Sequence, residues 1–183
     1  MSYVDPTLAC YTTSMSKTFS IPNQYADMAR AACLVLLHPS KPLFAVCSRR
    51  NSDIDGLPGG KQDLGETMAQ TASRETAEEV GVHVDVSKME LLFADAIPGK
   101  KEFWVETFVA VSPMQELAQM EEDITVKWTN WNEFSKNNAF KTYNANVQSA
   151  WNNWFECKQL GKPYVFDENH LTLTPVESNS PEF

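Results

Sequence analysis

Three glutamates crowd into five residues of the stretch SRETAEEVGV, residues 73–82. In a helix, Glu75, Glu78 and Glu79 stand at i, i+3 and i+4, so their carboxylates share one face. Gly81 follows directly, where a helix would end, and the acids therefore sit at the negative end of the helix dipole. Like-charge pairs at this spacing cost roughly 0.2–0.5 kcal/mol each. A helix shaped only by stability would avoid this arrangement.

A divalent cation would make the arrangement favourable. Mg²⁺ binds oxygen ligands, typically a few carboxylates together with water and substrate phosphates. Two unit charges 4 Å apart interact by roughly 4 kcal/mol at an effective dielectric of 20, which exceeds the helix penalties. The alternative is an ordinary solvated helix face, on which Arg74 pairs with Glu78 one turn along. The three acids alone leave both interpretations open.

The residues around the acids extend the pattern. From residue 59 to residue 82 the sequence reads GGKQDLGETMAQTASRETAEEVGV. This stretch resembles the signature of the Nudix hydrolase (MutT-like) family, G-x5-E-x7-R-E-U-x-E-E-x-G-U, where U is a bulky aliphatic residue. The matching charged and glycine positions are Gly60, Glu66, Arg74, Glu75, Glu78, Glu79 and Gly81. The one departure is Thr76, which stands at an aliphatic position on the face that we expect to pack against the core.

The resemblance implies a site where Mg²⁺, or Mn²⁺ in its place, grips a diphosphate. The implied metal ligands are Glu75, Glu78, Glu79 and the carbonyl oxygen of Gly59. Arg74 would hold the glutamates in place by charge-assisted hydrogen bonds, and Glu66 would orient the loop. The implied reaction is attack of water on a phosphorus of a nucleoside diphosphate linked to another group, where the metal neutralises charge and lowers the pKa of the water.

The general base is less defined. In some family members the counterpart of Glu75 serves, and in others an acid comes from the loop before a late strand. The stretch QMEEDITVKW, residues 119–128, lies where that loop would fall. Glu122 or Asp123 is therefore a candidate base or further ligand, and a solvated turn before a strand is the alternative.

Five residues outside the acids are candidates for substrate binding. Arg49 and Arg50 end a predicted strand beside the signature loop and would meet phosphates, unless they are plain surface charge. Lys61 lies in the signature loop, which lacks the spacing of a P-loop. Phe103 and Trp104 are neighbours on a predicted strand, so one faces the core and the other faces away. We take Trp104 as the candidate for stacking on a base, with core packing as the alternative.

The elements that must position these residues follow from periodicity and turn residues. Strands are predicted at residues 29–37, 43–50, 89–98, 102–111 and 124–131, with the first two paired as a hairpin, and residues 51–60 are predicted as a loop. Thr67 and Gln70 form a capping box that starts a helix at residues 68–80. A second amphipathic helix is predicted at residues 143–160, with Val147, Trp151, Trp154 and Phe155 on one side. This order predicts an α/β fold with a mixed β-sheet between helices, and the resemblance implies that this fold is a Nudix-type α/β/α sandwich.

Length and composition place this fold in one domain. The chain has 183 residues, of which 43% are hydrophobic. We expect an irregular N-terminal arm at residues 1–24, the Nudix hydrolase domain at 25–160 and an extended C-terminal tail at 161–183. The 24 acidic residues outnumber the 15 basic ones, for a net charge of −9. That charge disfavours a stable nucleic-acid complex and suits a protein that binds a cation.

The cellular setting follows from what the sequence lacks. Its four cysteines form no C-x-x-C pair, which favours a reducing compartment. The start of the chain has no secretory-signal pattern, and the longest apolar run, residues 31–37, is too short to span a bilayer. We therefore expect a soluble, cytoplasmic protein that does not bind a membrane. Many relatives pair as dimers, but the sequence does not decide whether this chain forms a homodimer.

The function expected from the resemblance is a Mg²⁺-dependent Nudix hydrolase that cleaves a phosphoanhydride bond in a nucleoside triphosphate or an ADP-ribose-like substrate. One alternative is a catalytically inactive Nudix domain that binds nucleotides as a regulator. Such proteins generally lose one or more of the glutamates, and all of them are present here. Another alternative is an acidic interaction domain without a ligand, which metal ions would not stabilise.

Overall fold

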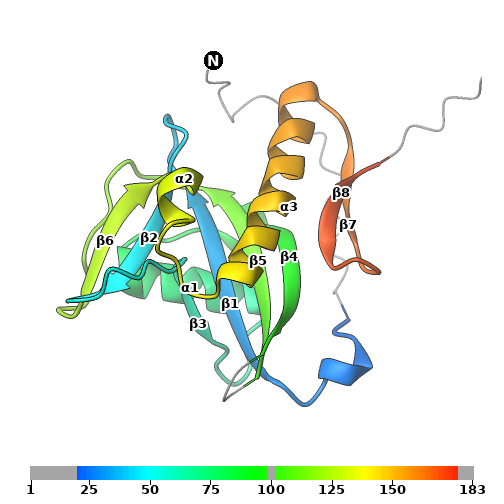
Figure 1. Ribbon diagram of the computed structural model, residues 1–183, viewed down its shortest axis with the longest axis horizontal. Coiled ribbons are helices and arrows are strands. Elements are labelled where there is room, and N and C mark those ends of the chain that lie inside the picture. The colour runs from blue at the N-terminus through cyan, green and yellow to red at the C-terminus, as the bar shows by residue number, and fades with distance from the viewer. Residues whose placement is uncertain (1–19, 99–101, 177–183) are drawn as a thin grey trace, which may run out of the picture.

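The computed structural model describes residues 20–98 and 102–176, and these form one sheet with helices on both faces (Figure 1). The strands are β1 (Ala29–Leu37), β2 (Phe44–Arg49), β3 (Gly59–Lys61), β4 (Glu90–Ile97), β5 (Phe103–Val111), β6 (Ile124–Thr129), β7 (Tyr164–Asp167) and β8 (Thr172–Pro175). Their order in the sheet is β6-β2-β1-β5-β4-β8-β7, and β3 pairs with β1 off this path. The pair β1 and β5 is parallel, whereas the other pairs of this sheet are antiparallel, so the sheet is mixed.

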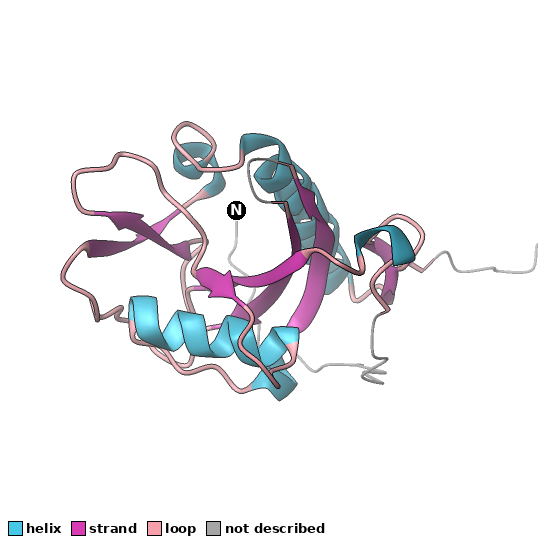
Figure 2. Cartoon of the chain, turned by 90° about the horizontal axis from the view of Figure 1, so that it is seen from below, coloured by secondary structure: helices cyan, strands magenta, loops and turns pink. Residues whose placement is uncertain are grey.

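Helices cover both faces of the sheet. The helices are α1 (Met68–Val80), α2 (Trp131–Phe134) and α3 (Lys141–Leu160), with short 3-10 turns at Asn23–Tyr25 and Val86–Lys88. Figure 2 shows α1 on one side of the strands and α2 and α3 on the other. The predicted mixed sheet between helices is confirmed. No helix within the described ranges is long and apolar enough to cross a membrane.

Each face of the sheet has its own apolar core. On the α1 side, Ala72 and Val80 pack with Leu34 and Leu36 of β1. On the α3 side, Val35 of β1 packs in a cluster that includes Trp131, Val147 and Trp154. A strand covered on both faces needs apolar side chains at consecutive positions rather than at alternate ones. This explains why residues 31–37 read as one continuous apolar run.

The boundaries of α1 are those predicted from its local sequence. The Thr67 side chain accepts a hydrogen bond from the Gln70 backbone N–H, and the Gln70 side chain accepts one from the Thr67 N–H, which completes the capping box. Gly81 ends the helix in the left-handed region with φ of 72°. Thr76 is fully buried, and its hydroxyl donates to the Ala72 carbonyl at 2.7 Å. The hydroxyl group that Thr76 brings into the core is therefore paired.

The predicted loop at residues 51–60 is wrong at its end, because Gly59 and Gly60 belong to β3. Gly59 pairs with Cys33 of β1. A Cβ at Gly59 would lie only 2.3 Å from the Ala32 carbonyl oxygen, so this close approach of two backbones requires glycine. A strand of three residues that begins with two glycines lacks the side-chain alternation by which strands are predicted.

The C-terminal part differs from the prediction in three places. β6 ends at Thr129, because the Asn130 side chain accepts a hydrogen bond from the Glu133 N–H at 3.0 Å and caps α2. Phe155 is 36% exposed and stacks on Trp151, so it does not join the buried side of α3. The segment expected as an extended tail contains β7 and β8, an antiparallel pair that continues the sheet beyond β4.

The N-terminal arm is described only from residue 20. Residues 20–22 lead into the 3-10 turn at Asn23–Tyr25, which includes the last two residues of the predicted arm. The remainder of the predicted arm, residues 1–19, lies outside the described residues.

Candidate metal and diphosphate site

The acidic face of α1 lies against the backbone of β3. The Gly59 N–H donates to Glu79 Oε2 at 2.9 Å. A Cβ at Gly60 would lie 2.5 Å from the Glu75 carboxyl group, so this glycine also makes room for an acid. The side chain of Glu75 is 16% exposed, whereas that of Glu78 is 52% exposed. The three glutamates therefore run from a half-buried position beside β3 toward solvent.

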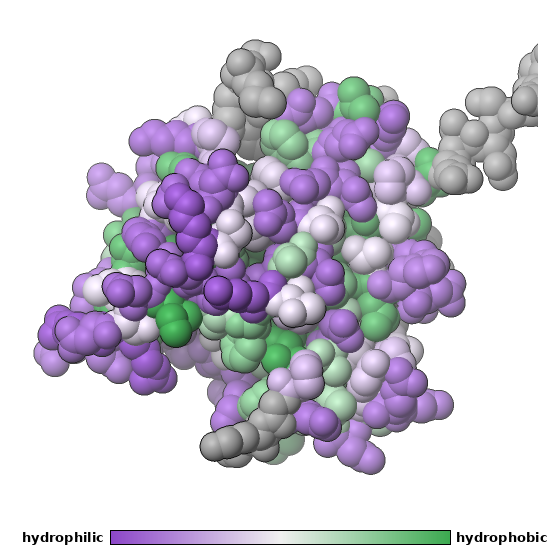
Figure 3. Space-filling view, in the orientation of Figure 1, coloured by the Kyte–Doolittle hydropathy of each residue, from purple (hydrophilic) through white to green (hydrophobic). Residues whose placement is uncertain are grey.

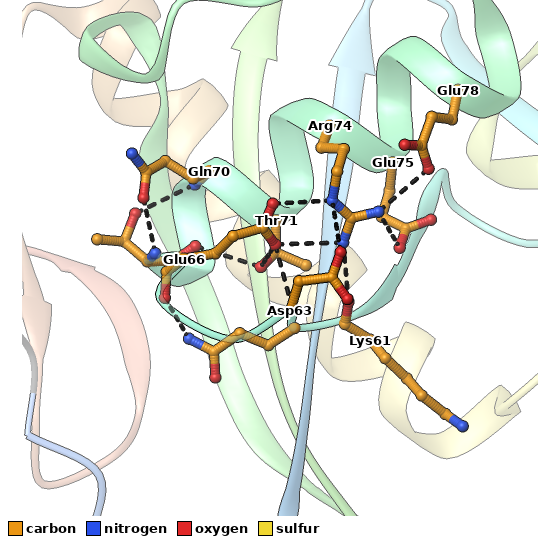
Figure 4. Close-up of polar contacts among 10 residues, drawn as sticks. Lys61, Asp63, Glu66, Gln70, Thr71, Arg74, Glu75 and Glu78 are labelled. Carbon is orange, nitrogen blue, oxygen red and sulfur yellow. Dashed lines mark hydrogen bonds and ion pairs between the residues drawn. The ribbon is translucent and has the colours of Figure 1, made fainter.

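Arg74 is bonded to several of these acids at once (Figure 4). Its Nη1 donates to Glu75 Oε1 at 2.9 Å and to Glu78 Oε2 at 3.1 Å. Its Nε donates to Glu66 Oε1 at 2.8 Å, and its Nη2 donates to the Lys61 carbonyl at 3.0 Å. With a further bond from Nη2 to Glu66 Oε2 at 3.2 Å, the planar guanidinium makes five hydrogen bonds, which fix its partners in direction as well as in distance. Arg74 thus holds two α1 glutamates and the loop after β3 in one arrangement.

Glu66 connects this loop to α1. Its carboxylate accepts hydrogen bonds from Arg74, from the Thr71 hydroxyl at 2.8 Å and from the Asp63 N–H at 3.2 Å. These bonds, led by that from Arg74, lower the pKa of Glu66 to about 2. The folded protein therefore stabilises the charged form of Glu66. Its hydrogen bonds hold the loop to α1 and do not point to the solvent side of the acidic face.

Two α1 glutamates have pKa values that are raised, in contrast to the lowered pKa of Glu66. The pKa of Glu79 is raised to about 7, by burial first and then by the charges of Glu75 and Glu121, although hydrogen bonds from the Gly59 N–H and the Cys47 thiol oppose the shift. Burial also raises the pKa of Glu75 against the opposing effect of Arg74. Such shifts mean that these carboxylates have too little positive charge around them for their burial. A cation beside them would supply it.

The donor set fits a hard divalent cation. Carboxylate oxygens from one helix face, beside the partly buried backbone of Gly59 and Gly60, are the ligand type that Mg²⁺ prefers. Among residues 20–98 and 102–176, no three acidic, histidine or cysteine side chains already converge on one point as a metal site. Glu75 and Glu78 are instead both directed to Arg74. The residues that fit an ion are thus present and close together, with their oxygens now shared with the guanidinium.

Two residues beside Glu79 were not predicted. The Cys47 thiol on β2 lies 3.4 Å from Glu79 Oε2 and donates to it, and burial first and the Glu79 charge second raise the pKa of this thiol. Glu121, in the segment before β6, is the acid of that segment whose charge acts on Glu79. Neither residue belongs to the signature. Both contacts depend on how distant segments fold together, and only the acidic composition of residues 121–123 hinted at Glu121.

The predicted residues at the end of β2 and just before β6 form a group that is separate from the α1 glutamates. Arg49 pairs with Asp123 at 3.6 Å, and their side chains are 84% and 64% exposed. The Arg50 N–H donates to the Asp123 carbonyl. Glu122 is exposed. In the part of the chain described, no hydrogen bond or ion pair joins Glu122 or Asp123 to the α1 glutamates.

The structure corrects the assignment of the stacking aromatic. Trp104 has no exposed surface, stacks on Tyr25 with ring centroids 5.0 Å apart, and donates from Nε1 to Glu106 at 3.2 Å. It is a core residue on the α1 side, and a fully buried ring cannot stack on a ligand. Its neighbour Phe103 faces the opposite side of the sheet and is only partly buried. Lys61 lies near it, with Nζ 5.8 Å from the centre of the Phe103 ring.

Comparison with known proteins identifies the family of the chain. Residues 27–148 match the NUDIX domain, so the chain belongs to the Nudix hydrolase family, a family of enzymes that act on acid anhydrides and generally use a divalent metal. No curated protein is similar enough in sequence to match the chain.

Several solved structures share the fold. The NUDIX domain of Shewanella oneidensis NrtR complexed with ADP ribose has 19% identity and a TM-score of 0.57, over 73% of this chain and 92% of that one. A C. elegans Ap4A hydrolase binary complex has 20% identity and a TM-score of 0.55, over 70% and 98%. A bifunctional NMN adenylyltransferase/ADP ribose pyrophosphatase from Francisella tularensis, complexed with AMP and a Mn ion, has 15% identity and a TM-score of 0.55, over 71% and 42%. At these identities the likeness establishes the fold alone.

Proposed function

We propose that this chain is a Mg²⁺-dependent hydrolase that cleaves a phosphoanhydride bond in a nucleoside diphosphate linked to another group. The two candidate substrate types are a nucleoside triphosphate and an ADP-ribose-like molecule. The observation that supports the proposal most is the complete set of α1 glutamates, two of which, Glu75 and Glu79, are half-buried against the glycine backbone of β3 and have raised pKa values. The names of similar structures, which include ADP ribose, Ap4A and AMP, support the same substrate class.

The residues that would hold the metal are Glu75, Glu78 and Glu79, with the carbonyl oxygen of Gly59. When bound, Mg²⁺ (or Mn²⁺ in its place) neutralises charge on the diphosphate and lowers the pKa of the attacking water. Arg74 keeps Glu75 and Glu78 side by side through its Nη1. Glu79 keeps its place through the Gly59 N–H and the Cys47 thiol.

Three acids are candidates for the base that accepts the proton from water. Glu75 is one candidate, because it lies at the centre of the acidic face. Glu122 and Asp123 are the others, and they would act from the segment before β6. Arg49, Arg50 and Lys61 are proposed to contact substrate phosphates through their cationic side chains.

The proposed partner is a small nucleotide and not a nucleic acid. A net charge of −9 opposes binding along a phosphate backbone. A small diphosphate instead needs only one local patch of cations and a metal. A cytoplasmic location stays a prediction from the sequence, which leaves open whether the chain forms a homodimer.

A substrate screen with product identification tests the proposal. The purified chain would be incubated with Mg²⁺ or Mn²⁺ and a panel of nucleoside triphosphates, ADP-ribose and dinucleoside polyphosphates. Products would be identified by mass spectrometry in ¹⁸O-labelled water, which shows the phosphorus that is attacked. We expect turnover of at least one compound that stops when the metal is chelated. Nucleotide binding without any product would favour the inactive regulator, and neither binding nor product would contradict the proposal.

A further inference from the structure

The side of the sheet that faces α3 carries a row of residues beside the acidic site. Lys61 of β3 pairs with Ala31 of β1, Ala31 pairs with Val105 of β5, and Val105 pairs with Asp95 of β4. Paired residues share one face of a sheet, so all four side chains point the same way. Phe103 and Ile97 form the next pair on this face. We call the surface formed by Lys61, Ala31, Asp95, Ile97 and Phe103 the β3–β4 face.

This face is continuous with the acidic site through β3. Successive residues of a strand point to opposite faces, so Gly60 meets Glu75 while Lys61 points to the other side. Figure 4 shows the Lys61 side chain directed away from Arg74. The contact between Lys61 and the Phe103 ring places the Lys61 ammonium group over the β3–β4 face. The acidic site and the β3–β4 face therefore meet at β3, one on each side of this strand.

The β3–β4 face is partly open. Ala31, Ile97 and Phe103 are only partly buried, and α3 packs mainly on β4 and β8 rather than on the starts of β1 and β5. Figure 3 shows apolar side chains gathered at the lower centre of the molecule, in the region where Figure 1 places β1, β3 and β5. The surface thus offers a half-exposed aromatic ring with apolar neighbours.

Asp95 gives this apolar surface one polar group. It is half-buried, and its Oδ1 accepts a local hydrogen bond from the Ala96 N–H at 2.7 Å. No ion pair to Asp95 occurs within the described part of the chain. Its charge acts on the buried Tyr143, whose hydroxyl is already bonded to Thr107 and to the Val105 carbonyl. A half-buried carboxylate among apolar side chains favours a partner that donates hydrogen bonds.

We propose that the base of the nucleotide substrate binds on the β3–β4 face, stacked on Phe103 and with an exocyclic amino group donating to Asp95. This assignment deepens the proposed function and rests on it for the position of the diphosphate. Lys61, whose ammonium group lies 5.8 Å from the centre of the Phe103 ring, would leave this ring to the base and turn toward the phosphate nearest the ribose. Neighbouring strands are about 4.8 Å apart, so the row from Lys61 to Asp95 spans about 14 Å, which gives room for an extended nucleotide. An ionised carboxylate only accepts hydrogen bonds, so the face selects adenine over hypoxanthine, which presents a carbonyl at the same position.

Binding of nucleoside monophosphates without metal tests this assignment separately from hydrolysis. Calorimetry would measure the affinity of AMP and of inosine monophosphate for the wild type, in which AMP binds more tightly. Phe103→Leu keeps an apolar side chain but removes the ring, and it should weaken both ligands by about tenfold. Phe103→Tyr restores the ring and should restore binding. Asp95→Asn can donate as well as accept, so it should remove the preference for AMP.

Phe155→Leu is the matched control, because Phe155 is an exposed aromatic on α3 that lies outside the β3–β4 face. It should leave both affinities unchanged, and thermal unfolding of each variant would confirm that it is folded. The proposal is overturned if the wild type binds neither monophosphate, if Phe103→Leu binds as the wild type does, or if Asp95→Asn keeps the preference for AMP. None of these results depends on turnover, so a failure here is distinct from a failure of the hydrolase proposal.

Discussion

At the scale of single residues, Glu79 carries the strongest indication of a cation site. One of its oxygens already accepts from the Gly59 N–H and the Cys47 thiol, yet burial still raises its pKa to about 7. Two neutral donors do not replace the hydration of a buried carboxylate next to Glu75 and Glu121. A divalent ion would do so, and this is the physical reason for placing Glu79 among the metal ligands.

Replacement of Glu79 by glutamine should separate activity from stability. Glu79→Gln keeps the shape and still accepts from the Gly59 N–H, but it removes the charge that would bind the metal. We expect kcat to fall by on the order of 100-fold or more, as for loss of other preorganised electrostatic groups. Unfolding in metal-free urea should show unchanged or slightly higher stability, because a desolvated charge is gone.

Glu156→Gln provides a control for the same chemical change on an exposed part of α3. It should alter neither kcat nor the urea midpoint. Full activity of Glu79→Gln on a substrate that the wild type hydrolyses would remove Glu79 from the metal site.

Residue positions were predictable where the chemistry is contiguous in sequence. Arg74 and the glutamates of α1 lie within one helix, so their spacing alone places them together. Cys47 reaches Glu79 across 32 residues, and nothing in its local sequence marks it. The choice between Phe103 and Trp104 needed the register of β5 against β4, since alternation indicates that one faces inward but not which one.

At the scale of elements, α1 and the loop before it act as one unit. Glu66 accepts from Arg74, Thr71 and Asp63, so it holds the loop to the helix. The helix itself was predictable to the residue, because a capping box and a C-terminal glycine are local signals. Strand β3 was not predictable. Its two glycines are required by their close approach to Ala32, Cys33 and Glu75, and glycines give no strand pattern in the sequence.

Glu66→Gln should destabilise the protein in a pH-dependent way. The pKa of Glu66 is lowered from 4.5 to about 2 in the folded state, so its contribution is fully present above about pH 4.5 and is lost as pH falls toward 2. At pH 7 the substitution should lower the free energy of unfolding by about 1.5–3 kcal/mol, the range for hydrogen bonds to charged groups. Urea unfolding across this pH range should show the two proteins converging in acid. A gap that stays constant from pH 7 to pH 2 would contradict the bonded, ionised state.

At the scale of the whole molecule, the sheet brings the acidic face of α1 and the β3–β4 face to the two sides of β3. β3 pairs with β1, so one side of β3 meets the α1 glutamates and the other side faces the β3–β4 face. The mixed sheet between helices could be predicted from the order of elements. The hairpin of β7 and β8 could not, because its strands are short and are held at the edge of the sheet by distant contacts, such as the bond from the Tyr164 hydroxyl to Glu90.

The most direct test of the central claim, that the α1 glutamates bind a divalent metal, is a titration of the protein with Mn²⁺ followed by electron paramagnetic resonance. We expect bound Mn²⁺ in the wild type, competition by Mg²⁺, and loss of binding in the Glu75→Gln, Glu79→Gln double variant. Glu156→Gln should bind as the wild type does. Equal Mn²⁺ binding by the wild type and the double variant, or no binding by either, would contradict the account.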